Sequence, residues 1–197
     1  KVSTTSVTLP ELGDGLWFWR VRARDSGWNW GPWSTVWKFR IDTKVQSPSL
    51  LLPPDSTITN DRTPTFTWTT VDDPFPPVTY ILQIDNEETF AEPLIYTKAG
   101  ITENQHTVEN ELPDGVYYWR VAAVDNFGNH GWSTRRKIII DASPPPPPTL
   151  LTPENNSFTN NRTPLFMWMR SSDISGVLYH FQLANDPDFL TLVYENY

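Results

Sequence analysis

The feature that most constrains this chain is an internal repeat with a period of about 100 residues. The segment NDRTPTFTW at Asn60–Trp68 returns as NNRTPLFMW at Asn160–Trp168. The segment DGLWFWRVRARD at Asp14–Asp25 returns as DGVYYWRVAAVD at Asp114–Asp125. The repeat is cut out of phase, because the chain starts in the second half of one repeat and stops in the first half of another. Repeats bury their apolar faces against their neighbours. The fold of this chain therefore depends on how each half-repeat buries its own apolar face.

The repeat divides the chain into three parts. We expect a C-terminal half-repeat at residues 1–43, a complete repeat at residues 48–142 and an N-terminal half-repeat at residues 148–197. The halves are complementary, since reading from Val193–Tyr197 on into Lys1–Gly15 follows the plan of Ile95–Gly115, one residue shorter. Neither half should bury its apolar face alone, and we expect the first to continue the last. Five consecutive prolines, Pro144–Pro148, favour a stiff polyproline II linker.

The complete repeat predicts a sandwich of two β-sheets with seven short strands. Phe66 and Trp68 alternate with threonines, and Tyr80, Leu82 and Ile84 alternate along the next segment, so each strand has one buried face. Nineteen prolines and turn residues between short apolar runs favour an all-β chain. The expected strands span residues 49–53, 63–70, 79–85, 95–96, 107–108, 116–125 and 133–140.

Composition excludes several classes of function. The net charge of -8 weighs against nucleic acid, which is bound by neutralising phosphates with Lys and Arg. The chain has no cysteine, so its domains are stabilised by their cores and not by disulfides. It has no apolar run of about 18 residues, so we expect no membrane insertion.

The order of these motifs resembles the fibronectin type III-like, immunoglobulin-like (Ig-like) tandem repeats of prokaryotic secreted and cell-surface proteins. The quoted pattern includes TPTFTW, LPDGVYYWRVAAVDNFGN and the WS that follows it, and the resemblance covers essentially the whole chain. It implies that Trp68 packs against Trp119, and that Trp168 and Trp19 hold the corresponding positions in the half-repeats.

The resemblance also implies a corner at the turn before the sixth strand, made by a Leu and a Tyr. Leu112 and Tyr117 match these positions. The first half-repeat departs from the pattern with Trp17 in the Tyr position, which puts the corner hydrogen bond there in question.

A tryptophan-rich stretch, WNWGPWSTVWKF at Trp28–Phe39, has two interpretations. Trp28, Trp30 and Trp37 could form a flat aromatic platform for sugar rings, as in an adhesin or a carbohydrate-binding module. Alternatively, Trp30 and Trp33 could interleave with arginines in a cation–π ladder, as WGPWS resembles the Trp-Ser box of cytokine receptors. We favour the ladder, because alternating arginines would occupy the ring faces; its members are Arg20, Arg22, Arg24, Trp30 and Trp33.

No set of residues indicates catalysis or a cofactor. His106, His130 and His180 are scattered without metal-ligand spacing, and no nucleophile elbow or phosphate-binding loop occurs. The acidic clusters at Asp72–Asp73, Asp85–Glu88 and Asn185–Asp188 lack the loop spacing of a calcium site, and we interpret them as solvated turns. Asn155 and Asn161 begin sequons and are candidate glycosylation sites.

These observations predict a non-enzymatic, extracellular structural protein. Strand completion between half-repeats would join units head to tail into a filament, stalk or surface array, as separate chains or as one continuous polypeptide. The alternatives are an adhesin or carbohydrate-binding module and a spacer of a large secreted enzyme. The residues expected to pack across the junction are Trp17, Trp19, Val21, Phe166, Trp168, Tyr179 and Phe181.

Overall fold

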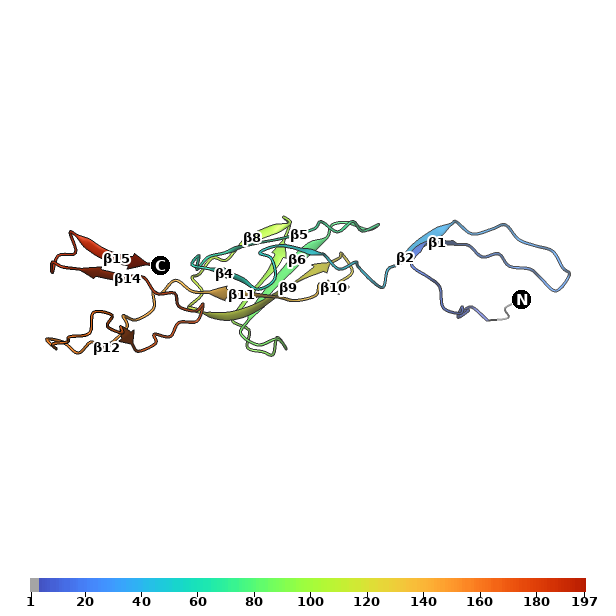
Figure 1. Ribbon diagram of the computed structural model, residues 1–197. Helices are drawn as coiled ribbons and strands as arrows, with labels where there is room; N and C mark the ends of the chain where they lie inside the picture. Colours follow the sequence, from blue (N-terminus) through green and yellow to red (C-terminus); the bar gives the residue numbers. More distant parts are fainter. Residues whose placement is uncertain (1–3) are drawn as a thin grey trace.

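The computed structural model describes residues 4–197, so residues 1–3 of the first expected half-repeat lie outside the described part. The described residues form fifteen β-strands and no helix, which confirms the all-β prediction. A central sandwich lies between two smaller parts, one at each end of an elongated molecule (Figure 1). Along residues 4–197 there is no helix long and apolar enough to cross a membrane.

The central sandwich has two sheets. The larger has the strand order β4-β11-β9-β6-β7, with β10 paired to β9, and the smaller has the order β3-β5-β8. The strands are β3 (Leu50–Leu52), β4 (Thr57–Thr59), β5 (Thr65–Trp68), β6 (Thr79–Asp85), β7 (Tyr96–Ile101), β8 (Gln105–Thr107), β9 (Gly115–Val124), β10 (His130–Trp132) and β11 (Arg136–Ile140).

The alternating aromatic residues make the core between the two sheets. Phe66, Trp68 and Trp119 are fully buried, as the alternation predicts. The ring centroids of Phe66 and Trp119 lie 4.8 Å apart across the sheets, and those of Trp68 and Tyr80 lie 5.5 Å apart. Aromatic pairs at this distance add about 0.5–1.5 kcal/mol beyond the area they bury.

The central sandwich contains two short strands that the sequence did not predict, β4 and β10, so it has nine strands where seven were expected. Strand β4 pairs in parallel with the edge of β11, through Thr57 opposite Ile138 and Thr59 opposite Ile140. Its single apolar side chain, Ile58, is exposed. An apolar alternation therefore could not reveal β4, which is held by backbone hydrogen bonds to another strand.

Among the described residues, the N-terminal part forms one two-stranded sheet and the C-terminal part forms two. The N-terminal part has β1 (Gly15–Trp19) paired with β2 (Trp37–Ile41). The C-terminal part has β12 (Leu150–Thr152) paired with β13 (Met167–Trp168), and β14 (Phe181–Ala184) paired with β15 (Leu192–Asn196). Figure 1 shows these last two hairpins as separate arms.

Candidate assembly interface

The C-terminal part keeps the local contacts of the first half of the central sandwich. The Tyr179 hydroxyl accepts the Ser171 backbone N–H at 2.9 Å, as the Tyr80 hydroxyl accepts the Val71 N–H at 2.8 Å. The Trp168 and Tyr179 rings lie 5.4 Å apart, which matches the central Trp68 pair. The same residue types therefore form the same local packing without the rest of a sandwich.

The apolar face of this part is open. Phe166, Trp168, Tyr179 and Phe181 are only partly buried, although they contact one another through ring pairs such as Phe166–Phe181 at 5.0 Å. The contrast is largest at Phe189, which is 51% exposed where its counterpart Phe90 is 7% exposed. The surface that β9 and β11 cover in the central sandwich has no cover here.

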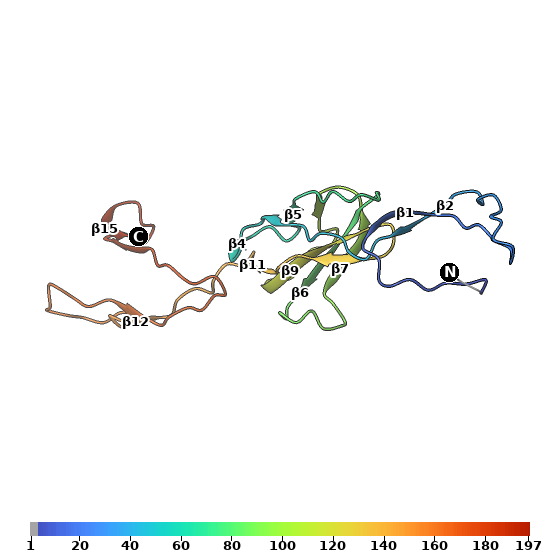
Figure 2. The same cartoon turned by 90° about the vertical axis from the view of Figure 1, so that its right-hand side faces the viewer.

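The N-terminal part is open in the complementary way. Trp17, Trp19 and Val21 are 37%, 49% and 60% exposed, whereas their central counterparts Tyr117, Trp119 and Val121 are at most 5% exposed. The predicted junction residues are thus apolar and accessible in both parts. They do not meet within one chain, because the two parts lie at opposite ends of the molecule in both views (Figures 1 and 2).

The corner hydrogen bond is present in both repeats, although its donor differs. The Tyr117 hydroxyl donates to the Pro113 carbonyl at 2.9 Å. The Trp17 indole N–H donates to the Gly13 carbonyl at 3.0 Å. The departure from Tyr to Trp therefore preserves the bond, because the indole nitrogen reaches the same carbonyl position.

Arginines and tryptophans form an alternating stack on the outer side of the N-terminal part. The guanidinium of Arg20 lies 4.2 Å from the Trp33 ring, and Arg22 lies between Trp33 at 4.6 Å and Trp30 at 4.2 Å. Arg24 continues the stack between Trp30 at 5.2 Å and Trp28 at 3.9 Å.

This stack bears on the aromatic-platform interpretation. A sugar ring needs a free ring face, and arginines lie over Trp28 and Trp30. The Trp37 ring lies edge-on to Trp19, 5.5 Å away, and is 64% exposed. The three tryptophans therefore do not form one flat surface with free faces.

The structure brings together three carboxylates that the sequence analysis did not connect. Asp42 at the end of β2, Asp73 in the loop after β5 and Asp125 after β9 have carboxylate oxygens within 4.8 Å of one another. Burial, followed by Asp73, raises the pKa of Asp42, whose Oδ2 is buried without a hydrogen-bond partner. Carboxylates in this arrangement are the ligand type that a hard cation takes.

Sequence reasoning missed this group because its members come from three segments and have no loop spacing. Only their repeated positions could have indicated it. Asp141 holds the place of Asp42 in the next linker, and Asp173 holds the place of Asp73.

Asp186 and Asn161, from an acidic cluster and a sequon, accept hydrogen bonds from backbone N–H groups within their own turns. The Asp186 carboxylate accepts the backbone N–H groups of Leu190 and Thr191, each at 2.9 Å, and these bonds lower its pKa. The Asn161 Oδ1 accepts the Thr163 N–H at 2.9 Å. Asn155 and Asn161 are both exposed, as glycosylation would require.

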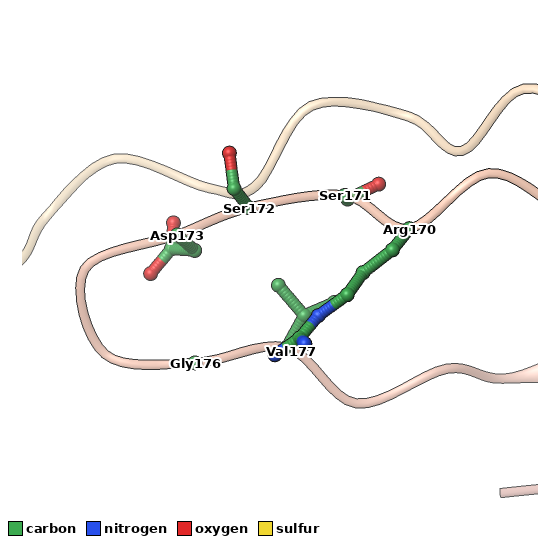
Figure 3. A pocket seen from close by; sticks show the side chains of 6 residues that line it. All are labelled: Arg170, Ser171, Ser172, Asp173, Gly176 and Val177. Atoms are coloured by element: carbon green, nitrogen blue, oxygen red, sulfur yellow. The ribbon is translucent and has the colours of Figure 1, made fainter.

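An open hollow lies inside the loop from Arg170 to Val177 (Figure 3). The Arg170 side chain reaches across the loop toward Val177. The Asp173 carboxylate accepts the Ser175 N–H and hydroxyl, each at 3.0 Å, and these bonds hold its pKa below the ordinary range. The Ser171 Oγ, which also lines the hollow, is buried without a hydrogen-bond partner.

Comparison with known proteins agrees with this architecture. Residues 54–142 match the family model of the bacterial Ig-like domain. The central sandwich is therefore similar to the bacterial Ig-like domain, in agreement with the resemblance drawn from the sequence for this repeat. Such domains are typically extracellular or surface-exposed, and the match indicates a surface or extracellular Ig-like module. No curated protein matches the chain.

Proposed function

We propose that this chain is a non-enzymatic structural subunit of an extracellular filament, stalk or surface array, built from tandem Ig-like domains joined head to tail. The observation that carries the proposal is the recurrence of the central domain's motifs and local contacts in both end parts, such as the Tyr179 bond to Ser171 and the Trp17 bond to Gly13. Exposed aromatic surface of this size is an aggregation hazard unless another surface covers it. The interface is heterologous, so repeated joining does not close and extends in one direction.

The charge and the central domain fit this role. A net charge of -8 disfavours nucleic acid as a partner, because its phosphates are bound by Lys and Arg. The role needs no cofactor, and its partner is another Ig-like unit. The location we propose is the cell surface or the extracellular medium.

Electron microscopy tests the proposal. The purified chain at high concentration should form thin, unbranched particles much longer than one molecule, and surface labelling of intact source cells should detect the central domain. Uniform single particles at every concentration, together with labelling only after the cells are broken, would contradict the proposal.

Glycan binding is the second candidate function. It is favoured by the exposure of Trp28, which is 71% exposed, and disfavoured by the arginine over its ring. A glycan that quenches the fluorescence of the Trp28–Trp37 stretch would support an adhesin. Unchanged fluorescence across a glycan panel would leave the structural role as the better account.

A further inference from the structure

We propose that Tyr96 and His106 form an acid-sensitive clasp, which joins the two sheets of the central sandwich at one edge and releases strands β7 and β8 in mild acid. The clasp consists of the hydrogen bond and the ring contact between these two side chains. It lies within the central domain, so it does not depend on the assembly proposed above.

The clasp connects the edge strands of the two sheets. Among the described residues, β7 is the last strand of the larger sheet and pairs only with β6. Strand β8 is the last strand of the smaller sheet and pairs only with β5. Each strand thus has backbone partners on one side, and side chains that reach between the sheets hold this edge of the sandwich together.

Both side chains of the clasp point into the space between the sheets. Tyr96 lies opposite Ile84 on β6, and His106 lies opposite Phe66 on β5. Directly opposed residues of neighbouring strands lie on the same face of their sheet, and both Ile84 and Phe66 are fully buried in the core. Tyr96 and His106 therefore approach each other from the two sheets at the border of the core, where each is partly buried.

The contact between the two side chains depends on the protonation state of the imidazole. The Tyr96 hydroxyl lies 2.6 Å from the His106 Nε2, and the two ring centroids lie 6.0 Å apart with an interplanar angle of 28°. In a neutral imidazole one nitrogen accepts and the other donates, so Nε2 can accept the hydroxyl proton while Nδ1 carries the ring proton. A protonated imidazole can only donate, so protonation removes the acceptor of the hydroxyl proton.

The surroundings of the clasp favour the neutral imidazole. Burial is the main cause that lowers the pKa of His106 below its ordinary value of 6.5. Burial likewise raises the pKa of Tyr96 above 10.0, which keeps the hydroxyl protonated and able to donate. Strand β5, which pairs with β8 through residues 65–67, has no ionisable side chain there.

An ion pair beside the clasp limits what could stabilise a charged His106. Glu109 raises the pKa of His106, and Lys98 lowers it. The Lys98 Nζ lies 2.5 Å from the Glu109 Oε1. The carboxylate nearest to the imidazole is therefore already paired, and its charge is offset by that of Lys98.

The sign of the pH dependence follows from these groups. The unfolded chain binds a proton at His106 with the ordinary pKa of 6.5, whereas the folded domain binds it only at lower pH. The clasp is therefore at full strength above about pH 6.5, and it weakens as the pH falls from there toward the folded pKa. Between pH 7.5 and pH 5.5 the equilibrium constant for opening β7 and β8 should rise several-fold, and by at most about tenfold.

The clasp is particular to the central repeat. The residue 100 positions before His106 is Ser6, whose side chain does not titrate in this range. Mild acid should therefore weaken this edge in the central domain without the same effect at the equivalent position of the preceding repeat. A series of such repeats would contain one unit that opens first in acid.

Hydrogen exchange of the whole chain tests the clasp. Protection factors of the β7 and β8 backbone amides, corrected for intrinsic rates, should fall several-fold from pH 7.5 to pH 5.5. His106→Gln keeps an oxygen that can accept from Tyr96 but does not titrate, so its protection should be equal at the two pH values. His130→Gln is the matched control, because it removes an exposed histidine of the same domain and should retain the full acid response.

Substitution of the ion pair tests the electrostatics without altering the clasp itself. Lys98→Gln removes the positive charge near His106 and should raise its pKa, whereas Glu109→Gln removes the negative charge and should lower it. An NMR titration of the His106 imidazole in the whole chain measures both shifts. Shifts of the same sign would mean that the charges do not control the imidazole and would overturn the proposal.

The remaining outcomes are equally decisive. An acid response that survives unchanged in His106→Gln, or that disappears in His130→Gln, would overturn the clasp. A His106 imidazole that titrates at pH 6.5 or above in the folded, unsubstituted chain would overturn it as well. The last measurement and the two ion-pair substitutions decide the question even where His106→Gln does not fold.

Discussion

At the scale of the residue, Trp19 and Trp119 are equivalent positions of one repeat in different surroundings. Trp119 is fully buried against Phe66, while Trp19 is 49% exposed. The same side chain therefore stabilises a domain in one place and should stabilise a junction in the other.

This contrast gives a paired prediction. Trp119→Ala should lower the unfolding free energy of the central domain by about 3–5 kcal/mol, because it removes a buried aromatic side chain and leaves a cavity. Trp19→Ala should leave that transition unchanged and abolish association. Urea denaturation and sedimentation measure the two effects, and a central domain equally sensitive to both substitutions would contradict the assignment.

Tyr117 gives a prediction of pH dependence. Burial, and then Asp114, raise the pKa of Tyr117 above its ordinary value of 10.0. Because the folded state holds the proton more tightly, its contribution is complete below about pH 10 and is lost as the pH rises through the folded pKa.

Tyr117→Phe should therefore behave differently in two pH ranges. At pH 7 it should lower the unfolding free energy by about 0.5–1.5 kcal/mol, since it removes the hydrogen bond to the Pro113 carbonyl. Above pH 10 the difference from the unsubstituted chain should shrink, which denaturant midpoints measured at both pH values would detect. A constant difference would mean that the phenol does not titrate through this site.

At the scale of the element, the alternation of apolar residues predicted which face of each strand is buried. The buried faces of β5, β6 and β9 follow from the alternation around Trp68, Leu82 and Trp119, which are fully buried. Strand β4 was missed because its partner β11 is distant in sequence, and the Asp42–Asp73–Asp125 group was missed for the same reason. Contacts between distant segments leave no periodic signal in either segment.

Strand β4 also shows which elements depend on a completed sandwich. Its counterpart, residues 157–159, forms no strand, and Phe158 within it is fully exposed. The counterpart of β11 is β2, which lies at the other end of the chain. Completion by a second copy would place β2 beside residues 157–159.

Hydrogen exchange tests this dependence. The backbone amides of residues 157–159 should exchange rapidly in dilute solution and become protected in the assembled state, while those of β4 should be protected in both. Exchange at residues 157–159 that stays fast after assembly would show that β2 does not dock there.

At the scale of the whole molecule, the linker between the first two parts packs on the central domain. Val45 is buried in its core, and the Asn129 side chain donates to the Asp42 carbonyl at 3.2 Å. Gly131 lies so close that an added Cβ would stand 2.6 Å from the carbonyl oxygens of Val45 and Gln46. Packing at this linker therefore restricts the orientation of the N-terminal part on the central domain.

Gly131→Ala should therefore push the linker away from β10. The expected loss is about 1–3 kcal/mol of unfolding free energy, typical of overpacking, with a broader distribution of molecular lengths in X-ray scattering. Gly13→Ala is the control, because an added Cβ there meets no atom within 4 Å. Equal, small effects of both substitutions would mean that the linker moves freely.

The measurement that tests the central claim most directly is the native mass of the chain as its concentration is raised, followed by its mass in hot denaturant. The account predicts a series of multiples of 22.7 kDa that grows with concentration and returns to 22.7 kDa in denaturant. A species of 22.7 kDa at every concentration would contradict completion between copies and show that the two open faces do not bind each other.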